Sequence, residues 1–212
     1  MLGNQHGGHM LKKHQRGFSM VEVVVTIAVL AVLMAAVTPS AAGLVANLRL
    51  RSAAEAVMTG LQKARSEAIK SNQIVTLWLM SANSAGALDG TCALSGTSSS
   101  WVVSYDDPSG SCDSVPSTIT SPRIVQINSA GPSSSGLAVS ALNSAGAAST
   151  QVGFNGYGRR PDGVAATDIS TIDFTSSTSG TRRLRIQVSS VGGVRMCDRD
   201  VTVTTDPRYC TP

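Results

Sequence analysis

Residues 17–37 read GFSMVEVVVTIAVLAVLMAAV, and this stretch decides the fold of the N-terminal part of the chain. Its only polar residues after Gly17 are Ser19, Glu22 and Thr26. At about 1.5 Å per residue, a helix over residues 18–37 spans roughly 30 Å, the thickness of the hydrocarbon core of a bilayer. The stretch therefore predicts a membrane-spanning helix.

Four basic residues precede the apolar stretch: Lys12, Lys13, His14 and Arg16. Positive charge beside a membrane helix stays on the cytoplasmic side, so we expect the rest of the chain on the other side. Two ordinary interpretations exist. A cleaved signal peptide needs a shorter apolar core and a cleavage site between small residues, for which residues 35–42 offer alanines. A plain membrane anchor explains the length, with Glu22 reaching toward the interface.

A third interpretation accounts for more of the stretch. Residues 17–22, GFSMVE, resemble the signature of type IV prepilins. The resemblance implies that a prepilin peptidase cuts after Gly17 and that Phe18 is then N-methylated. It also implies that Glu22 pairs with the N-terminal amine of a neighbouring pilin, and that Pro39 bends the helix.

The resemblance extends to the leader and to the location of the protein. A leader of residues 1–17 is long for prepilins, whereas a start at Met10 gives MLKKHQRG, a typical length. We therefore expect Met10 to be the native start. The resemblance implies a bacterial inner-membrane protein that crosses the membrane once, with its head in the periplasm and, after assembly, in a pilus or pseudopilus.

The pattern changes after Pro39 from uniformly apolar to amphipathic. Apolar residues recur at steps of three and four at Leu50, Ala54, Val57, Met58, Leu61, Ala64 and Ala68. Charged residues mostly occupy the other faces. The pattern predicts that the membrane and assembly helix of residues 18–38 continues as an amphipathic helix over 39–72. That helix is expected to pack one stripe on a globular head and to end at Asn72.

Residues 73–212 are predicted to form a β-rich head. Strand-forming residues are concentrated in 73–80, 101–105, 123–128, 137–141, 151–155, 168–176 and 182–190. The stretches between them are rich in Ser and Gly and bury little apolar surface, so they are predicted loops. The fold class is therefore α+β. A long N-terminal helix packed on an antiparallel sheet is also what the pilin resemblance implies.

The four cysteines, Cys92, Cys112, Cys197 and Cys210, all lie in this head. They form no CxxC pair and have no histidine near them in the sequence, which argues against a metal site. An even number of cysteines beyond an export signal indicates disulfides. Three pairings exist. The favoured one joins Cys92 to Cys112 and Cys197 to Cys210, because it closes the shortest loops.

Three further segments resemble the GspH/FimT group of minor pilins and type II secretion pseudopilins. Residues 61–69 read LQKARSEAI, close to a segment that precedes the first strand in that group. Residues 153–159, GFNGYGR, and 192–197, GGVRMC, resemble its strand and C-terminal signatures. The resemblance touches both ends of the chain, while residues 81–149 match no signature.

The head carries little that an enzyme needs. It contains no histidine, which excludes a Ser-His-Asp triad and a His-ligated metal there, and it has no phosphate-binding GxxxxGK motif. The acidic segments DDPSG and CDRD read as turns. A calcium site formed by Asp198, Asp200 and Asp206 is the remaining metal hypothesis. We predict a protein without catalytic residues, cofactor or metal.

Arginine is the more informative residue of the head, because no lysine follows Lys70 and the chain has a net charge of +4. The candidate DNA-binding residues are Arg159, Arg160, Arg183, Arg185, Arg195, Arg199 and Arg208. Alternation along 182–188 places Arg183, Arg185 and Gln187 on one face of a strand, a spacing suited to phosphates. The plain alternative is that nearby aspartates neutralise these arginines.

The family resemblance gives the DNA hypothesis limited support. Some FimT-like proteins are associated with DNA uptake through an arginine-bearing C-terminal region that resembles GRxR. Residues 192–195, GGVR, keep the second arginine as Arg195 and have Gly193 in place of the first.

The sequence thus predicts a structural minor pilin or pseudopilin that assembles with other pilins through its N-terminal helix, with DNA as a candidate partner. The alternatives are a type II secretion pseudopilin that does not bind DNA, and a membrane-tethered binding module with no role in a fibre.

Overall fold

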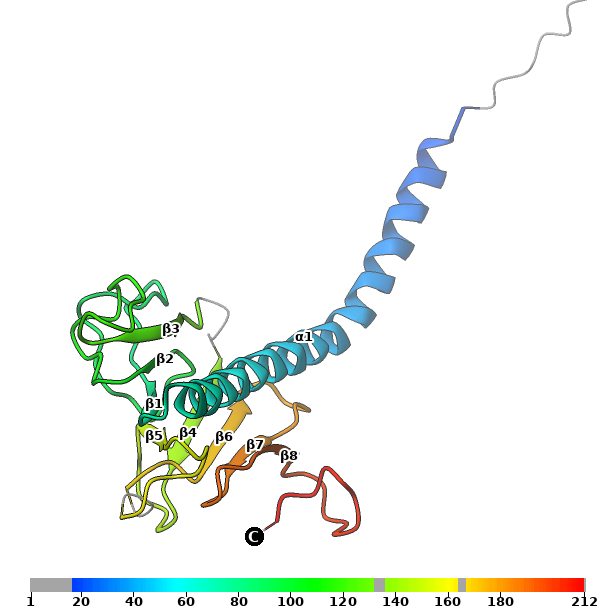
Figure 1. Ribbon diagram of the computed structural model, residues 1–212. Coiled ribbons are helices and arrows are strands. Elements are labelled where there is room, and N and C mark those ends of the chain that lie inside the picture. The colour runs from blue at the N-terminus through cyan, green and yellow to red at the C-terminus, as the bar shows by residue number, and fades with distance from the viewer. Residues whose placement is uncertain (1–16, 132–135, 164–166, 212) are drawn as a thin grey trace, which may run out of the picture. The chain divides into compact units, whose positions relative to one another are not determined.

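The computed structural model describes residues 17–131, 136–163 and 167–211, without the side chains of residues 35–41. The chain divides into two compact units, Met1–Ser40 and Ala41–Pro212. One helix, α1 (Met20–Ser71), is followed by eight strands in the described part (Figure 1). The strands are β1 (Val75–Leu79), β2 (Trp101–Ser104), β3 (Ile124–Asn128), β4 (Leu137–Leu142), β5 (Gln151–Phe154), β6 (Thr171–Ser176), β7 (Leu184–Val188) and β8 (Val194–Asp198).

The first part of α1 exposes its apolar residues. The large apolar side chains described between Phe18 and Met34 are 44% to 88% exposed. None of the helices, as far as their residues are described, is long and apolar enough to cross a membrane. The predicted single membrane span therefore stays a prediction. The predicted start at Met10 and the side chain of Pro39 both lie outside the described residues, so the bend at Pro39 also stays a prediction.

The later part of α1 is amphipathic, as its sequence predicts. Leu50 is 1% exposed, and the stripe formed by Ala54, Val57, Leu61, Ala64 and Ala68 is fully buried. The helix ends at Ser71, and Asn72 follows with a φ of 52°, the left-handed conformation that commonly terminates helices. The prediction that the helix ends at Asn72 is confirmed.

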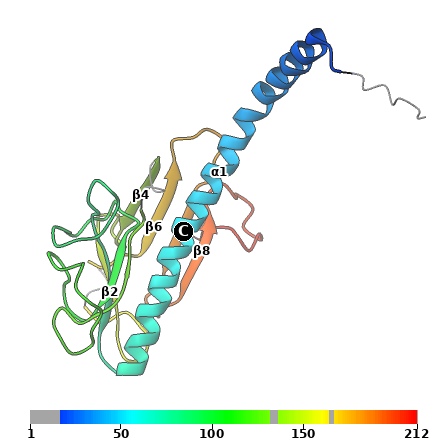
Figure 2. The ribbon, with the colours of Figure 1, turned by 90° about the horizontal axis from the view of Figure 1, so that it is seen from above.

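The strands form two four-stranded antiparallel sheets. The first has the order β3-β2-β1-β5, and the second has the order β4-β6-β7-β8. Figure 2 shows the later part of α1 running over strands of both sheets, and one buried apolar cluster joins this part of α1 to β1, β2, β5, β6 and β7. The predicted α+β class is confirmed, with two sheets where one was expected.

Backbone hydrogen bonds join the two sheets at β5. The amide of Ile169, just before β6, donates to the carbonyl of Gln151 at 2.8 Å. The amide of Gly153 donates to Oδ2 of Asp168 at 3.0 Å, so an aspartate side chain takes the place of a strand partner. The head therefore behaves as one packed body rather than as two independent sheets.

A second apolar cluster lies on the other side of the first sheet. It contains Met80, Val102 and Ile124 together with the disulfide-bonded Cys92 and Cys112. All four residues of β2 are buried as a result, because α1 covers one face of this strand and the disulfide region covers the other. Cys197 is bonded to Cys210, so the favoured pairing of the four cysteines is confirmed.

The sequence predicted seven strands, each end within three residues of its place in the structure, and missed β8. This strand reads VRMCD and pairs with β7 on one side, and on the other side its last residue, Asp198, forms a bridge to Tyr209. Its pattern was hidden because Arg195 and Asp198 interrupt the apolar residues and because the Asp198 end was interpreted as a turn. That turn is present directly after β8, where Val201 donates to the carbonyl of Asp198 at 3.3 Å.

Candidate functional site

The predicted processing site lies just ahead of α1. Gly17 is non-helical and a side chain there would meet nothing within 4 Å, while Phe18 is 82% exposed. Glu22 is exposed in the first turn of the helix, where the helix dipole favours a carboxylate. The bond between Gly17 and Phe18 is thus sterically open, and Glu22 lies one helical turn from the residue that cleavage would make the N-terminus.

The predicted arginine face belongs to the second sheet. Leu184, Ile186 and Val188 of β7 point into the core, which leaves Arg185 and Gln187 on the outer face. The alternation predicted for residues 182–188 is therefore confirmed. The electrostatic environment of these arginines, however, is set by aspartates on neighbouring strands and turns.

Asp173 of β6 neutralises the centre of this face. It is paired in register with Arg185, whose Nε and Nη2 donate to its two carboxylate oxygens at 2.6 and 2.8 Å. Arg199 donates to the same carboxylate at 3.0 Å. The hydrogen bond to Asp173 raises the pKa of Arg185 against the opposing effect of burial. Two of the candidate arginines thus bind the same buried aspartate.

Two further candidates are held by carboxylates near them. Arg183 Nε contacts Oδ1 of Asp200 at 2.6 Å. Burial alone would raise the pKa of Asp200, but hydrogen bonds from the Arg183 amide and guanidinium outweigh it and lower that pKa. Arg208 contacts Asp206 at 2.8 Å, and this bond lowers the pKa of the Asp206 carboxyl.

Arg160 is not on the surface at all. It is 6% exposed, and its Nη2 donates to the backbone carbonyl of Asp168 at 2.9 Å. Burial lowers the pKa of Arg160 and raises the pKa of the Asp168 carboxyl, although their mutual attraction opposes both shifts. Arg160 therefore stabilises the junction of the two sheets, which corrects its assignment to the candidate DNA surface.

The last two candidates differ from the others. Arg159 is exposed, and the acceptors of Arg195 in the described part of the chain are neutral: Gln187 Oε1 at 2.8 Å, the Tyr209 carbonyl at 3.1 Å and Thr211 Oγ1 at 3.0 Å. Among the described residues, neither forms an ion pair with a carboxylate. Their positive charges are thus less compensated than those of the other candidates.

A groove of about 730 Å³ surrounds Arg195 on the outer face of the second sheet. The polar residues that line it include Ser170, Gln187 and Thr211. Thr211 belongs to the C-terminal tail, which the Cys197–Cys210 disulfide holds against β8. The groove presents hydroxyl and amide groups beside two guanidiniums, that of Arg195 and that of Arg185, which binds Asp173. Such a lining suits an anionic ligand.

The GFNGYGR segment is a structural joint, which the sequence did not reveal. The side chain of Asn155 accepts from the amides of Tyr157 and Arg159, closing a turn. A side chain on Gly156 would collide with Asn72, so the turn packs against the end of α1. Gly158 has a φ of +70°, and its carbonyl accepts from Arg65 Nε at 2.9 Å.

The GGVRMC segment meets the same joint. Gly192 has a φ of +81° and lies so close to the Gly158 carbonyl that no side chain fits between them. The amide of Arg160 donates to the Ser190 carbonyl at 3.3 Å. The two signature segments are therefore neighbours, and they hold the end of α1, the first sheet and the β7–β8 hairpin together.

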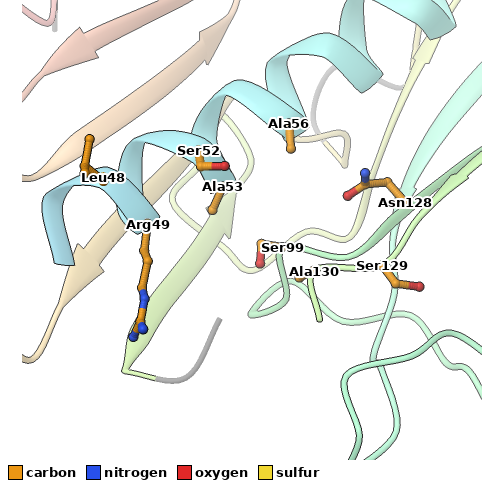
Figure 3. Close-up of a pocket in the computed structure, with 9 residues that line it drawn as sticks. All are labelled: Leu48, Arg49, Ser52, Ala53, Ala56, Ser99, Asn128, Ser129 and Ala130. Atoms are coloured by element: carbon orange, nitrogen blue, oxygen red, sulfur yellow. The ribbon is translucent and has the colours of Figure 1, made fainter. Parts of the chain in front are cut away.

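A cavity of about 410 Å³ lies beside α1 (Figure 3). Ser52, Ala53 and Ala56 line its helical side, and Ser99 and Asn128 line the opposite side. Its one charged lining residue is Arg49, which extends away from Ala56 in this view. The lining contains serine hydroxyls but no carboxylate or histidine that could act as a general base beside them.

The calcium hypothesis is not supported. Within residues 17–131, 136–163 and 167–211, no three acidic, histidine or cysteine side chains group closely enough to hold a metal ion. Asp198, Asp200 and Asp206 instead bind Arg182, Arg183 and Arg208. The three carboxylates that the sequence suggested as calcium ligands thus bind arginines.

A long N-terminal helix that exposes its first apolar part and packs its later part on antiparallel sheets defines a type IV pilin-like protein. Residues 53–192 match the family described as type II transport protein GspH, and residues 12–38 match the prokaryotic N-terminal methylation motif. The chain belongs to the GspH family.

Two solved structures of the type IV minor pilin FimU of Pseudomonas aeruginosa resemble the chain. One, in space group P21, is 19% identical, covering 69% of this chain and 87% of FimU with a TM-score of 0.40. The other, in space group P65, is 14% identical, covering 69% and 90% with a TM-score of 0.37. No curated protein sequence matches the chain.

Proposed function

We propose that this chain is a structural subunit, a minor pilin or pseudopilin, of a type IV pilus or type II secretion filament. The observation that carries the proposal is the pairing of a GspH match over residues 53–192 with a methylation motif over 12–38. A prepilin peptidase removes the leader after Gly17, and Phe18 is methylated. The helix anchors the subunit in the bacterial inner membrane with its head in the periplasm.

Assembly moves the exposed apolar part of α1 from lipid into a bundle of like helices. Its side chains are exposed over the whole described part, so burial against other helices is the source of its binding free energy. Glu22 pairs with the N-terminal amine of a neighbour and fixes the axial position of the subunit. A carboxylate is tolerated in such an apolar bundle when a cation meets it.

The subunit acts by assembly and not by catalysis. The cavity beside α1 lacks acid–base groups, and the carboxylates of the second sheet are engaged by arginines. These features favour a scaffold over an enzyme. They fit both a pilus subunit and a secretion pseudopilin.

DNA is a second candidate ligand, favoured by the guanidiniums of Arg159 and Arg195, which form no ion pair with a carboxylate of the described residues. The surface is smaller than the sequence predicts, because Arg183, Arg185, Arg199 and Arg208 bind aspartates and Arg160 is buried. Any DNA contact therefore centres on the groove around Arg195. A pseudopilin that does not bind DNA is the alternative.

The mass of the mature N-terminus tests the assembly proposal. The chain is expressed with its prepilin peptidase, purified from membranes and analysed by mass spectrometry. We expect a terminus at methylated Phe18. A chain that still begins at Met1 or Met10, or one that is cut after residue 37, contradicts the proposal and favours a tethered binding module.

Binding of double-stranded DNA as a function of salt tests the second candidate. Arg195→Gln should weaken binding and reduce the logarithmic salt slope by about one. Arg51→Gln is the control, because Arg51 is an exposed arginine of α1 that pairs with Glu55. Equal effects of the two substitutions would show that Arg195 has no special role.

A further inference from the structure

One row of paired residues crosses all four strands of the second sheet on its outer face. Leu142 of β4 is paired with Thr171 of β6, Thr171 with Gln187 of β7, and Gln187 with Arg195 of β8. Residues that are paired directly across antiparallel strands share one face of the sheet. Because neighbouring strands lie about 4.8 Å apart, the row extends over roughly 14 Å. We call it the cross-strand row.

All four residues of the cross-strand row line the groove of about 730 Å³ around Arg195. Along β7, Arg185 precedes the row, and its ion pair with Asp173 borders the groove on that side. The turn between β7 and β8 follows the row, and there the amide of Gly193 donates to Ser189 Oγ at 2.9 Å. The groove therefore follows the row across the face of the sheet.

Hydrogen bonds hold the polar end of the row in place. Arg195 Nη2 donates to Gln187 Oε1 at 2.8 Å and to Thr211 Oγ1 at 3.0 Å. Gln187 Nε2 donates to the Thr211 carbonyl at 2.6 Å, and the Cys197–Cys210 disulfide holds the tail directly before Thr211. Side chains that are fixed before binding lose little conformational entropy when a ligand arrives.

The two guanidiniums in the groove differ in their partners. Arg185 donates from Nε and Nη2 to the carboxylate of Asp173. Arg195 forms no ion pair with a carboxylate of the described residues, and its acceptors among them all bind Nη2. Nε and Nη1 of Arg195 therefore remain as donors, and a charge-assisted hydrogen bond to an anionic oxygen is the strongest that they can form. The groove thus suits a ligand with one negative charge at this end.

Neither a nucleic acid nor a peptide fits these features as closely as a sugar chain does. Duplex DNA gains its affinity from several phosphates that each meet a cation, and single strands stack on aromatic side chains. None of the described residues that line the groove is aromatic. A peptide extends a sheet at its edge strand, whereas this groove lies over the face.

Sugar hydroxyls both donate and accept hydrogen bonds, as do the side chains of Thr171, Gln187 and Thr211. The carbon-bound hydrogens of a sugar ring can contact Leu142 at the other end of the row. A carboxylate on one sugar unit supplies the negative charge that Arg195 lacks.

We propose that this groove binds an acidic polysaccharide, with the carboxylate of one sugar unit on Arg195 and neighbouring units along the cross-strand row. The groove lies entirely in the head of one chain, so the proposal goes beyond the assembly function and does not depend on it. DNA is the rival occupant of the same groove, and the experiment separates the two.

Calorimetric titration of the full chain in detergent tests the proposal. The ligand is tetragalacturonate, which carries one carboxylate per sugar, and the control ligand is the same oligosaccharide with its carboxylates methyl-esterified. We expect the acid to bind about tenfold or more tightly than the ester, because the ester loses the charge-assisted bond to Arg195. Equal binding of the two, or no binding of the acid, overturns the proposal. DNA binding that Arg195→Gln weakens, without binding of the acid, assigns the groove to DNA instead.

Two pairs of variants locate the binding on the cross-strand row. Arg195→Gln should weaken binding of the acid about tenfold or more, whereas Arg159→Gln, at an exposed arginine outside the groove, should leave it unchanged. Thr171→Val removes one hydroxyl and should weaken binding about two- to tenfold. Thr175→Val is its control, because Thr175 lies on the same face of β6 outside the groove. Equal effects within either pair overturn the proposal, and the melting temperature of each variant verifies that it is folded.

Discussion

The two parts of α1 use similar residues in opposite ways. Val21, Val32 and Leu33 in the first part are 59% to 71% exposed, whereas Val57 and Leu61 in the later part are completely buried. Helix propensity does not distinguish these positions, since the same residue types occur in both. The difference is that sheets of the same chain cover the apolar side chains of the later part, whereas those of the first part are exposed.

The two parts of the helix differ in what the burial of their apolar side chains stabilises. Burial of the later stripe contributes to the folding of the head, and it is complete within one chain. Burial of the first part can contribute only to association with membrane or with other subunits. Substitutions in the two parts should therefore change different measurements.

The largest effect is expected from Leu61→Ala. Leu61 is fully buried between α1 and the sheets, so its truncation should lower the free energy of unfolding by about 2–5 kcal/mol. Leu33→Ala, at a residue 59% exposed, should change it by less than about 0.5 kcal/mol. Tryptophan fluorescence of the full chain in detergent during urea unfolding measures both. Equal effects would mean that the two parts of the helix are not energetically separate.

Glu22→Gln should act on assembly alone. Loss of the pair with the neighbouring amine is expected to reduce filament incorporation by about tenfold or more, while the stability of the head stays unchanged. Glu55→Gln in the later part of the helix is the matched control, because Glu55 is exposed and binds only Arg51 of its own chain. Quantitative blotting of filament and membrane fractions gives the ratio. If Glu55→Gln lowers incorporation as much, the role assigned to Glu22 is wrong.

The glycines of α1 should respond in opposite directions. A methyl group on Gly60 would lie 2.8 Å from Leu77 Cδ1 and 2.8 Å from the Trp101 ring, whereas one on Gly43 meets nothing within 4 Å. Gly60→Ala should therefore lower the free energy of unfolding by about 1–3 kcal/mol before a helix-propensity gain of about 1 kcal/mol is counted. Gly43→Ala should raise it by a fraction of that gain. Thermal melts of both variants decide the sign.

The smallest expected effect is on the melting temperature at acidic pH. Arg123 binds Asp106 through a hydrogen bond that lowers the Asp106 pKa despite some burial, and it also contacts Gln73 just beyond α1. A lowered folded pKa adds stability above the unfolded value of about 3.9, and that stability is lost as pH falls through the folded pKa. Asp106→Asn should therefore flatten the decline of the melting temperature below about pH 4. If the decline is unchanged in this variant, carboxylates other than Asp106 cause it.

Much of the fold could be predicted because its signals are periodic and local. The spacing of Leu50, Ala54, Val57 and Leu61 identified the buried stripe, and alternation along β7 identified its inner face. The preference for the pairing that closes the shortest loops predicted the correct disulfides. β8 was missed because an edge strand needs only one partner and one covered face, so Arg195 and Asp198 could interrupt its apolar pattern.

The candidate DNA surface could not be predicted from the sequence to the same degree. Arg185 finds its partner Asp173 on the neighbouring strand, and Arg199 reaches the same carboxylate from a turn. Arg159 and Arg160 are adjacent in sequence, yet one is exposed and the other is buried. The composition gives the number of charged residues but does not show which arginines form ion pairs with carboxylates.

The sequence by itself determined the processing motif at Gly17 and Phe18, the apolar helix, the amphipathic stripe and the strand content. Each depends on residues that are close together along the chain. Only the tertiary structure decided which arginines stay uncompensated, that Arg65 binds Gly158 93 residues away, and that a groove forms beside Leu48. These features need contacts between distant segments, because electrostatic compensation and packing depend on distance in space and not on position in the sequence.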